Sequence, residues 1–202
     1  MGKLYTDIDD KLRSFIEAQH VFFVATAPNG GGGHVNCSPK GLDSFRVLGG
    51  RTVAYVDFVG SGIETIAHVR ENGRIVMMFC AFEGSPKILR LHGRATVVEP
   101  ADTEFEALFG HFGRGQRASI RAIVRTEVTR ISDSCGYGVP LFRYERERAQ
   151  LFAWAERKGA AGLEAYKRER NAASIDGLAG LRSVTTDAAQ QGVAADGTSR
   201  RR

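Results

Sequence analysis

The chain has 202 residues, of which 43% are hydrophobic, and it carries a formal net charge of +5. This size suits one globular domain with a real core, and no apolar run approaches the ~18 residues of a membrane-spanning helix. Basic residues are mixed with acidic ones, as in residues 143–170 with eight Lys or Arg and five Glu, and this mixture disfavours a nucleic-acid-binding surface.

The N-terminal part predicts one helix followed by several strands. Residues 6–19, TDIDDKLRSFIEAQ, have a helical pattern in which Thr6 can cap the first turn and four apolar residues share one face. HVFFVATA predicts a strand, PNGGGG at residues 28–33 predicts a flexible turn, and HVNCSPKG predicts a short strand. SFRVLGGRTVAYVDF predicts a hairpin that turns at Gly49-Gly50.

The rest of the chain predicts a helix, three more strands and a helical end. GSGIETIAHVRENG, residues 60–73, opens that helix, and the strands are RIVMMFCAF, KILRLHGRATVV and IRAIVRTEVTRI, with a short helix in ADTEFEALFGHF. Residues 145–172 predict one or two charged helices, interrupted at Gly159 or Gly162. Residues 183–202 are small, polar and rich in glycine, which is typical of a disordered tail.

Strands follow strands mostly at hairpin distances, with few helices between them. This order favours an antiparallel barrel over a parallel α/β sheet. We therefore divide the chain into a β-domain at residues 1–142, a helical extension at 143–182 and the tail.

The first turn of residues 60–73 allows two interpretations. Ser61 and Glu64 have the spacing of a capping box, in which the two side chains bind free backbone N–H groups. Gly73 is then a typical C-terminal stop. The same glycines and hydroxyls, with Thr65, also suit a phosphate, because N–H groups point outward at a helix N-terminus and the helix dipole favours negative charge.

Two further groups of cations are candidates for anion binding. Lys40 lies in NCSPKG, residues 36–41, where a proline fixes the backbone ahead of it. It could contact a phosphate or an electron-rich ring, or it could be an ordinary surface lysine in a turn. Arg90, His92 and Arg94 share one face of their strand, and this face suits carboxylates of a second subunit, a bound anion, or water.

The cysteines and histidines predict neither a disulfide nor a metal site. Cys37, Cys80 and Cys135 form no CxxC pair, and the five histidines show no metal-ligand spacing. Acidic residues precede any apolar stretch at the N-terminus, which is unlike a secretory signal. We expect reduced thiols in a cytoplasmic protein.

The order of these stretches is similar to that of a known family. HVNCSPKG, VAYVDFVGSGIETIAHVRENGRIVMMF and ILRLHGRATVV together resemble the pyridoxamine 5'-phosphate oxidase-like split-barrel flavin-binding proteins over about residues 10–131. ENGRIVMMF and LHGR are the most specific parts. The resemblance implies a mainly β fold with flanking helices, built as a six-stranded antiparallel split barrel. It also implies a homodimer with FMN in grooves at the dimer interface.

The resemblance places cofactor-binding roles on nine positions. Lys40 lies near the flavin at the end of a strand, Val56 and Asp57 lie on the strand that lines the ring, and GSGIET supplies the phosphate loop. Arg90 completes the site from the other subunit. The nine positions are Ser38, Lys40, Val56, Asp57, Ser61, Gly62, Glu64, Thr65 and Arg90.

The chain departs from the vitamin-oxidising members of that family. They commonly have Arg-Lys where this chain has Glu64-Thr65, and their substrate-binding Arg-Leu pair near the C-terminus is not evident here. We therefore expect an FMN-dependent oxidoreductase with a small-molecule substrate other than vitamin B6, and we assign no catalytic residue. The alternatives are a deazaflavin-dependent reductase and a non-catalytic flavin or haem carrier.

Overall fold

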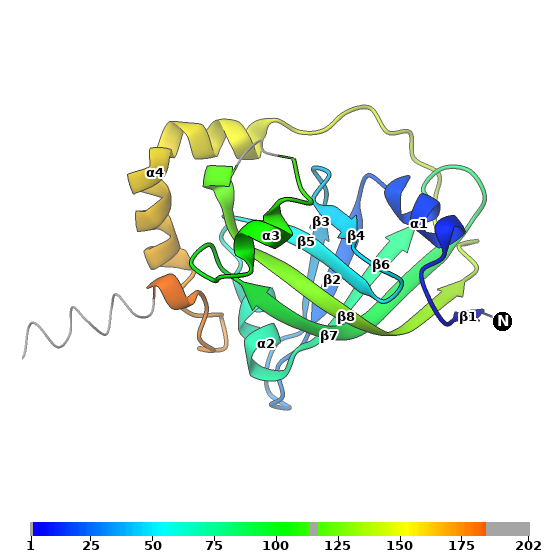
Figure 1. The fold of residues 1–202 in the computed structure, drawn as a ribbon, viewed down its shortest axis with the longest axis horizontal. Helices are drawn as coiled ribbons and strands as arrows, with labels where there is room; N and C mark the ends of the chain where they lie inside the picture. The colour runs from blue at the N-terminus through cyan, green and yellow to red at the C-terminus, as the bar shows by residue number, and fades with distance from the viewer. Residues whose placement is uncertain (1, 114–116, 185–202) are drawn as a thin grey trace, which may run out of the picture.

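The structure is a computed structural model that describes residues 2–113 and 117–184, and a curved antiparallel sheet dominates it (Figure 1). The sheet has the order β3-β2-β6-β7-β8-β5-β4, and β1 pairs with β8. The strands are β1 (Leu4–Tyr5), β2 (Phe22–Thr26), β3 (Asn36–Lys40), β4 (Phe45–Val47), β5 (Thr52–Phe58), β6 (Arg74–Cys80), β7 (Ile88–Val98) and β8 (Ile120–Ser134).

The predicted antiparallel β class is confirmed, but the count of six strands was wrong. The sheet has eight strands, because β4 and the two-residue β1 also pair with it. The long strands β7 and β8 pair with each other, and β8 carries a bulge in this pairing. Arg130 and Val128 face His92 and Gly93, which leaves Thr129 as an extra residue. Such extra residues bend a strand, and here they help to curl the sheet around its core.

Helices flank the sheet, and a short 3-10 turn precedes β8. The helices are α1 (Asp10–Glu17), α2 (Glu64–Asn72), α3 (Phe105–Phe109) and α4 (Gln150–Arg170), and the turn is η1 (Arg117–Ser119). Helix α1 closes one end of the core through Leu12 and Ile16, whereas α4 bends around the opposite end (Figure 1). The core between them is built from side chains on the concave face of the strands.

The predicted cap of the first helix was wrong by three residues. Asp9, not Thr6, is the N-cap, and its Oδ1 accepts the N–H of Leu12 at 2.8 Å. Ile8 is buried in the core just before this cap, which fixes where the helix can begin. The helix stop at Gly73 is confirmed, because this residue is the C-cap of α2 with φ of 69°.

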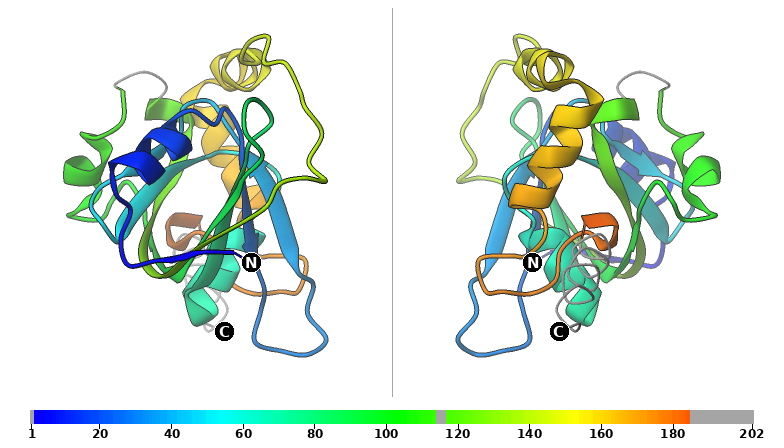
Figure 2. Two further views of the ribbon diagram at one scale, coloured as in Figure 1. Left: turned by 90° about the vertical axis from the view of Figure 1, so that its right-hand side faces the viewer. Right: turned by 90° about the vertical axis from the view of Figure 1, so that its left-hand side faces the viewer.

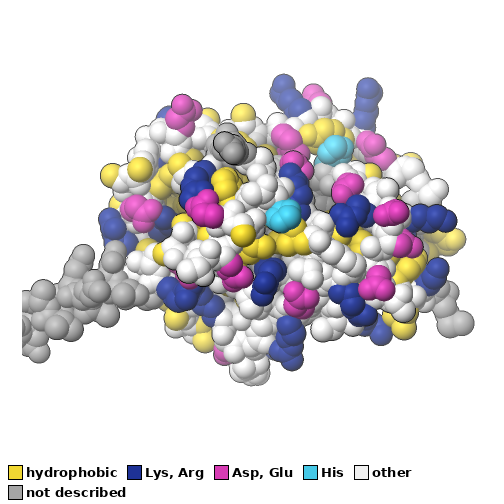
Figure 3. All heavy atoms as spheres, viewed as in Figure 1, with side chains coloured by type: hydrophobic (Ala, Val, Ile, Leu, Met, Phe, Trp, Pro, Cys, Tyr) yellow, Lys and Arg dark blue, Asp and Glu magenta, His cyan; other side chains and the backbone are white. Residues whose placement is uncertain are grey.

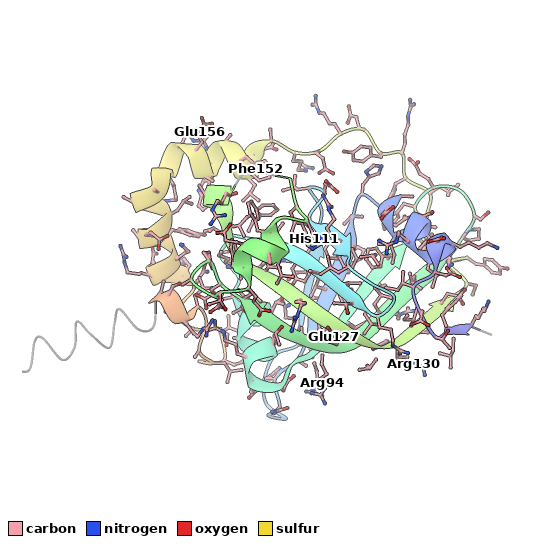
Figure 4. The ribbon with its side chains drawn as sticks, viewed as in Figure 1. Arg94, His111, Glu127, Arg130, Phe152 and Glu156 are labelled. Carbon is pink, nitrogen blue, oxygen red and sulfur yellow. The ribbon has the colours of Figure 1, made fainter. Side chains whose placement is uncertain are left out.

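Helix α4 is interrupted at the first of the two predicted glycines. Gly159 has φ of 63° and ψ of 175°, a backbone conformation that glycine adopts without steric cost. The half before the break packs Phe152 against Phe58 of β5, with ring centroids 5.4 Å apart. Phe152 faces the barrel, while Glu156 points away from it (Figure 4).

The segment after α4, residues 171–184, returns to the barrel and packs against it. Leu181 and Val184 are buried with Ile63 and Ile66. The tail predicted from residue 183 thus begins with two residues that belong to the packed body, and residues 185–202 lie outside the described part. Figure 2 shows this segment beside the loop between β2 and β3.

The described surface is mixed in charge. On the face shown in Figure 3, Lys and Arg side chains alternate with Asp and Glu side chains. Among the described residues, no helix is both long and apolar enough to cross a membrane.

Glu99 anchors the C-terminal segment to the end of β7. It is 2% exposed and accepts the N–H groups of Arg182 and Ser183 at 2.9 and 3.1 Å, together with the guanidinium of Arg70. Burial alone would raise the pKa of this carboxyl. The two N–H groups and the charge of Arg70 outweigh burial, so its pKa is lowered.

Replacing Glu99 by Gln should lower the free energy of unfolding by about 1.5–3 kcal/mol at pH 7, because charged hydrogen bonds are lost. The difference in unfolding free energy between the wild type and Glu99→Gln should be smaller in acid. Because the pKa of Glu99 is lower in the folded protein than in the unfolded chain, the ionised carboxylate stabilises the fold at pH values above the unfolded pKa of about 4.3. This stabilisation is lost as the pH falls through the folded pKa. Urea unfolding at pH 7 and at pH 3 measures both effects.

Glu104→Gln is the matched control, since Glu104 makes an exposed pair with Arg125 at 3.5 Å. It should cost less than about 1 kcal/mol. Equal losses for the two variants would show that Glu99 is not the anchor.

Candidate functional site

A buried carboxylate joins two cations near one end of the barrel. Asp57 of β5 is 0% exposed, and its Oδ1 lies 2.6 Å from Nζ of Lys40, while its Oδ2 lies 2.9 Å from Nε of Arg121. Lys40 belongs to β3 at one edge of the sheet, whereas β5 is next to the strand at the other edge. The Lys40–Asp57 pair therefore joins opposite sides of the curled sheet, and two cations on one anion leave an excess positive charge.

A bulge in β8 places Arg121 in this cluster. Asp57 pairs with Ala122 and Phe58 pairs with Ile120, so Arg121 is an extra residue without a partner on β5. Arg121 was not among the residues predicted for the site. The available signal was a charged residue in the otherwise apolar run Ile120–Val124, since a buried Arg requires a partner.

Arg121 also holds the loop that precedes α2. Its Nη1 donates to the carbonyl of Gly60 at 3.1 Å, and its Nη2 donates to the carbonyl of Gly62 at 2.6 Å. One guanidinium thus binds the Asp57 carboxylate and two carbonyls of the stretch GSG, residues 60–62. We call this stretch the GSG loop.

The protonation states in the cluster follow from its charges. Burial would raise the pKa of Asp57, but the adjacent Arg121 and Lys40 outweigh it and lower that pKa. Tyr55 lies two residues earlier on the same strand, and burial together with the Asp57 charge holds its pKa well above the usual value of 10.0. At neutral pH the cluster therefore contains an ionised Asp57 and a protonated Tyr55.

A second polar network links two more of the predicted site residues. Ser38 donates to Oδ1 of Asn36 at 3.1 Å, and Nδ2 of Asn36 donates to Oγ1 of Thr65 at 2.9 Å. Thr65 is buried, so its hydroxyl faces the interior rather than the mouth of α2. Ser38 and Thr65 thus connect β3 to the first turn of the helix.

The predicted capping box does not form. The N-cap of α2 is Ile63, which makes no side-chain cap hydrogen bond, and the helix begins two residues too late for Ser61 to cap it. Ile63 is buried against Leu181, and this packing sets the start of the helix. Ser61 and Gly62 are exposed and Glu64 is partly exposed, so they lie at the mouth of α2.

The structure does not bring Val56 and Arg90 into the cluster. Val56 alternates with Asp57 along β5 and packs in a separate apolar cluster with Phe105. Arg90 donates to Oγ of Ser134 at 2.9 Å. Ser134 follows Arg121 on the same strand by 13 residues. Among the described residues, neither a hydrogen bond nor an ion pair joins Arg90 to Asp57 or to the GSG loop.

The other two residues predicted to share a strand face with Arg90, His92 and Arg94, also interact with groups of the same chain. Arg94 projects away from the barrel (Figure 4) and donates to the carbonyl of Asn72 at 2.6 Å. Burial and the nearby Arg130 and Arg90 lower the pKa of His92. Among residues 2–113 and 117–184, no group of three or more His, Cys, Asp or Glu could hold a metal ion.

Asp57→Asn should lower the free energy of unfolding by about 3–5 kcal/mol at pH 7, because it leaves two partly or fully buried cations without a counter-charge. Asp43→Asn is the control: its pair with Arg46 is exposed on the Asp43 side and should matter by less than about 1 kcal/mol. Chemical unfolding of both variants measures this. A stable Asp57→Asn protein would contradict the role of Asp57 as the counter-charge.

Comparison with known proteins places this geometry in a family. The sequence pattern of the family described as Pyridoxamine 5'-phosphate oxidase matches residues 8–135. The chain is 38% identical to the Pyridoxamine 5'-phosphate oxidase family protein ustO of Aspergillus flavus, with 93% of this chain and 81% of that protein covered.

Solved structures share the fold. The H111A variant of HupZ from Group A Streptococcus is 24% identical and superposes with a TM-score of 0.52 over 63% of this chain and 99% of that one. HupZ itself has a TM-score of 0.50 at 24% identity, over 61% of this chain and 91% of that one. The family pattern and the Aspergillus relative together show that the chain belongs to the pyridoxamine 5'-phosphate oxidase family.

Proposed function

We propose that this protein is a flavin-dependent oxidoreductase that holds FMN by its phosphate at the GSG loop. The observation that carries the proposal is the excess positive charge directly beneath that loop. Lys40 and Arg121 share the single carboxylate of Asp57, and Arg121 contacts the loop itself. A phosphate is the complementary anion, because partly buried charge is stabilised by an opposite charge.

The exposed groups of the loop fit a phosphate. The hydroxyl of Ser61 is a donor, and the first N–H groups of α2 have no partner within the helix. Gly62 has no side chain, and Oε2 of Glu64 lies 2.9 Å from where its Cβ would be, so Glu64 faces the loop. Glu64 opposes an anion, so it is the group at this site that should weaken the affinity.

The remaining polar groups suit the flavin ring and its surroundings. Nζ of Lys40 makes one hydrogen bond within the described part of the chain, to Asp57, and has donors left for an electron-rich ring. Asp57 holds this ammonium in place. The bound flavin supplies the redox chemistry, while the chain binds the phosphate, orients the ring and shapes access for a small substrate.

Vitamin B6 is not the substrate that we propose. Glu64 and Thr65 stand where the vitamin-oxidising enzymes commonly have Arg-Lys, and the buried Thr65 faces the interior. We also infer a cytoplasmic location, which the three free cysteines support.

We further propose that the protein is a homodimer. The segment after β8 presents large apolar side chains to solvent, with Tyr137, Leu141 and Phe142 exposed by 84%, 74% and 59%. Such a patch is typical of a protein interface. A two-fold partner could also bring its own Arg90 to the site.

The loop assignment predicts the affinities of two variants. Ser61→Ala should weaken FMN binding by roughly 10- to 150-fold, since a hydrogen bond to a charged group contributes about 1.5–3 kcal/mol. Glu64→Gln should strengthen FMN binding, because it removes a negative charge beside the phosphate. Riboflavin lacks the phosphate and should respond to neither change. Fluorescence titration of each apoprotein gives the dissociation constants.

Ser85→Ala, in the exposed turn between β6 and β7, is the matched control and should bind FMN like the wild type. Ser61 does not cap α2, so Ser61→Ala should leave the unfolding free energy within about 0.5 kcal/mol. An unchanged FMN affinity in Ser61→Ala would remove the loop from the site. An absorbance spectrum of the purified protein separates flavin from deazaflavin and haem.

The dimer predicts a mass near twice that of one chain by light scattering at micromolar concentration. Leu141→Asp should raise the dimer dissociation constant about tenfold or more, because it places a charge in an apolar contact. Val35→Asp is the control and should leave the dimer dissociation constant unchanged, because Val35 lies elsewhere on the chain and is 75% exposed. A monomeric wild type at that concentration would overturn the proposal.

A further inference from the structure

We propose that Asn171, the residue after α4, is a positioning residue for the GSG loop, and that the C-terminal segment 171–184 thereby sets the affinity of the phosphate site. The first part rests on geometry alone, whereas the second part rests on the proposed function. This segment lies outside residues 8–135, which the family pattern matches. The coupling therefore lies outside the part of the chain that the family pattern describes.

The contact is a buried hydrogen bond to the loop backbone. Asn171 is 0% exposed, and its Nδ2 donates to the carbonyl of Gly60 at 2.9 Å. The same carbonyl accepts Nη1 of Arg121 at 3.1 Å. A carbonyl oxygen accepts two hydrogen bonds, so one donor from the barrel and one from the extension complete it. The position of Gly60 is thus fixed from both sides.

Asn171 is itself held in place by the backbone around it. Its N–H donates to the carbonyl of Lys167, and its own carbonyl accepts the N–H of Leu181 at 2.9 Å. Its Oδ1 is buried and has no hydrogen-bond partner among the described residues. A buried amide that leaves one group unsatisfied is a poor choice for stability alone, and the donor that reaches Gly60 accounts for its presence.

The rest of the segment packs on the other end of the loop. Leu181 and Val184 pack with Ile63, the N-cap of α2. Gly180 allows this close approach, because a Cβ there would lie 2.1 Å from the carbonyl oxygen of Asn171 and 2.8 Å from Cγ1 of Ile63. Gly60 and Ile63 bracket the GSG loop, so the segment contacts both of its ends.

A second contact of the same segment provides a control. Asp176 accepts the N–H of His34 at 2.8 Å, and its Oδ1 lies 2.6 Å from Nδ1 of His34. This contact joins the segment to the loop between β2 and β3 (Figure 2), and it involves no residue of the GSG loop. Asp176→Asn therefore loosens the segment without removing the bond to Gly60.

The first measurement is hydrogen–deuterium exchange of the apoprotein in the full chain, compared between wild type, Asn171→Leu and Asp176→Asn. Amides of residues 60–64 should exchange on the order of tenfold faster in Asn171→Leu, since the lost bond releases the loop. Asp176→Asn should leave them unchanged. Because no cofactor is involved, unchanged exchange in Asn171→Leu overturns the positioning role whatever the protein binds.

The second measurement is titration of the same variants with FMN and with riboflavin. Asn171→Leu should weaken FMN binding about tenfold or more, while riboflavin binding and the affinities of Asp176→Asn stay within about threefold of wild type. Altered exchange with an unchanged FMN affinity would overturn the link to the phosphate site. A wild type that binds no FMN would instead reject the proposed function.

If Asn171→Leu does not fold, Asn171→Ser replaces it. The serine side chain is too short to reach Gly60 but is still polar. This variant should show the same faster exchange and weaker FMN binding. Wild-type behaviour of a folded Asn171→Ser protein would overturn the proposal.

Discussion

The ionised carboxylate of Asp57 is the group around which the rest of the site is arranged. A carboxylate with no exposed surface remains charged only where cations and donors replace its water, and here Lys40 and Arg121 do so. The two cations come from β3 and β8. Strand β3 lies at one edge of the sheet, whereas β5, which carries Asp57, is next to the strand at the other edge. The same interaction that satisfies the buried charge thus fastens the curled sheet at one end.

The geometry of the GSG loop follows from this arrangement. The bulge at Arg121 turns a guanidinium inward, where it binds Asp57 and still reaches the carbonyls of Gly60 and Gly62. With these carbonyls held inward, the exposed Ser61 side chain and the start of α2 remain at the surface. A loop fixed before its ligand arrives loses little freedom on binding, which favours affinity.

The C-terminal extension adds a second source of order to the same loop. In one direction Asn171 reaches Gly60, and in the other Glu99 holds the backbone of Arg182 and Ser183 at the end of β7. Leu181 packs against the first turn of α2. The extension and the barrel therefore share one packed region, although the extension follows the last strand by many residues.

Local pattern was enough to predict most of the elements. Apolar patterns and turn residues predicted most of the strands. Glycine chemistry predicted the end of α2 at Gly73 and a break in α4 at Gly159 or Gly162, of which the structure has the first, because a positive φ is a property of single residues. The family resemblance placed Lys40 and Asp57 in one site, and the structure brings them within 2.6 Å. These features depend on residues close in sequence or on motifs that can be recognised.

Other features were decided only when the chain closed on itself. The cap at Asp9 and the N-cap of α2 at Ile63 were set by the burial of Ile8 and of Ile63 itself, which overrode the local capping pattern. Arg121 entered the site through a bulge, and a bulge depends on the register between two distant strands. The bond from Asn171 to Gly60 spans 111 positions. The sequence by itself determined most of the strands, the turns and the family, whereas the tertiary structure decided the contacts of the site, because they depend on which distant surfaces pack together.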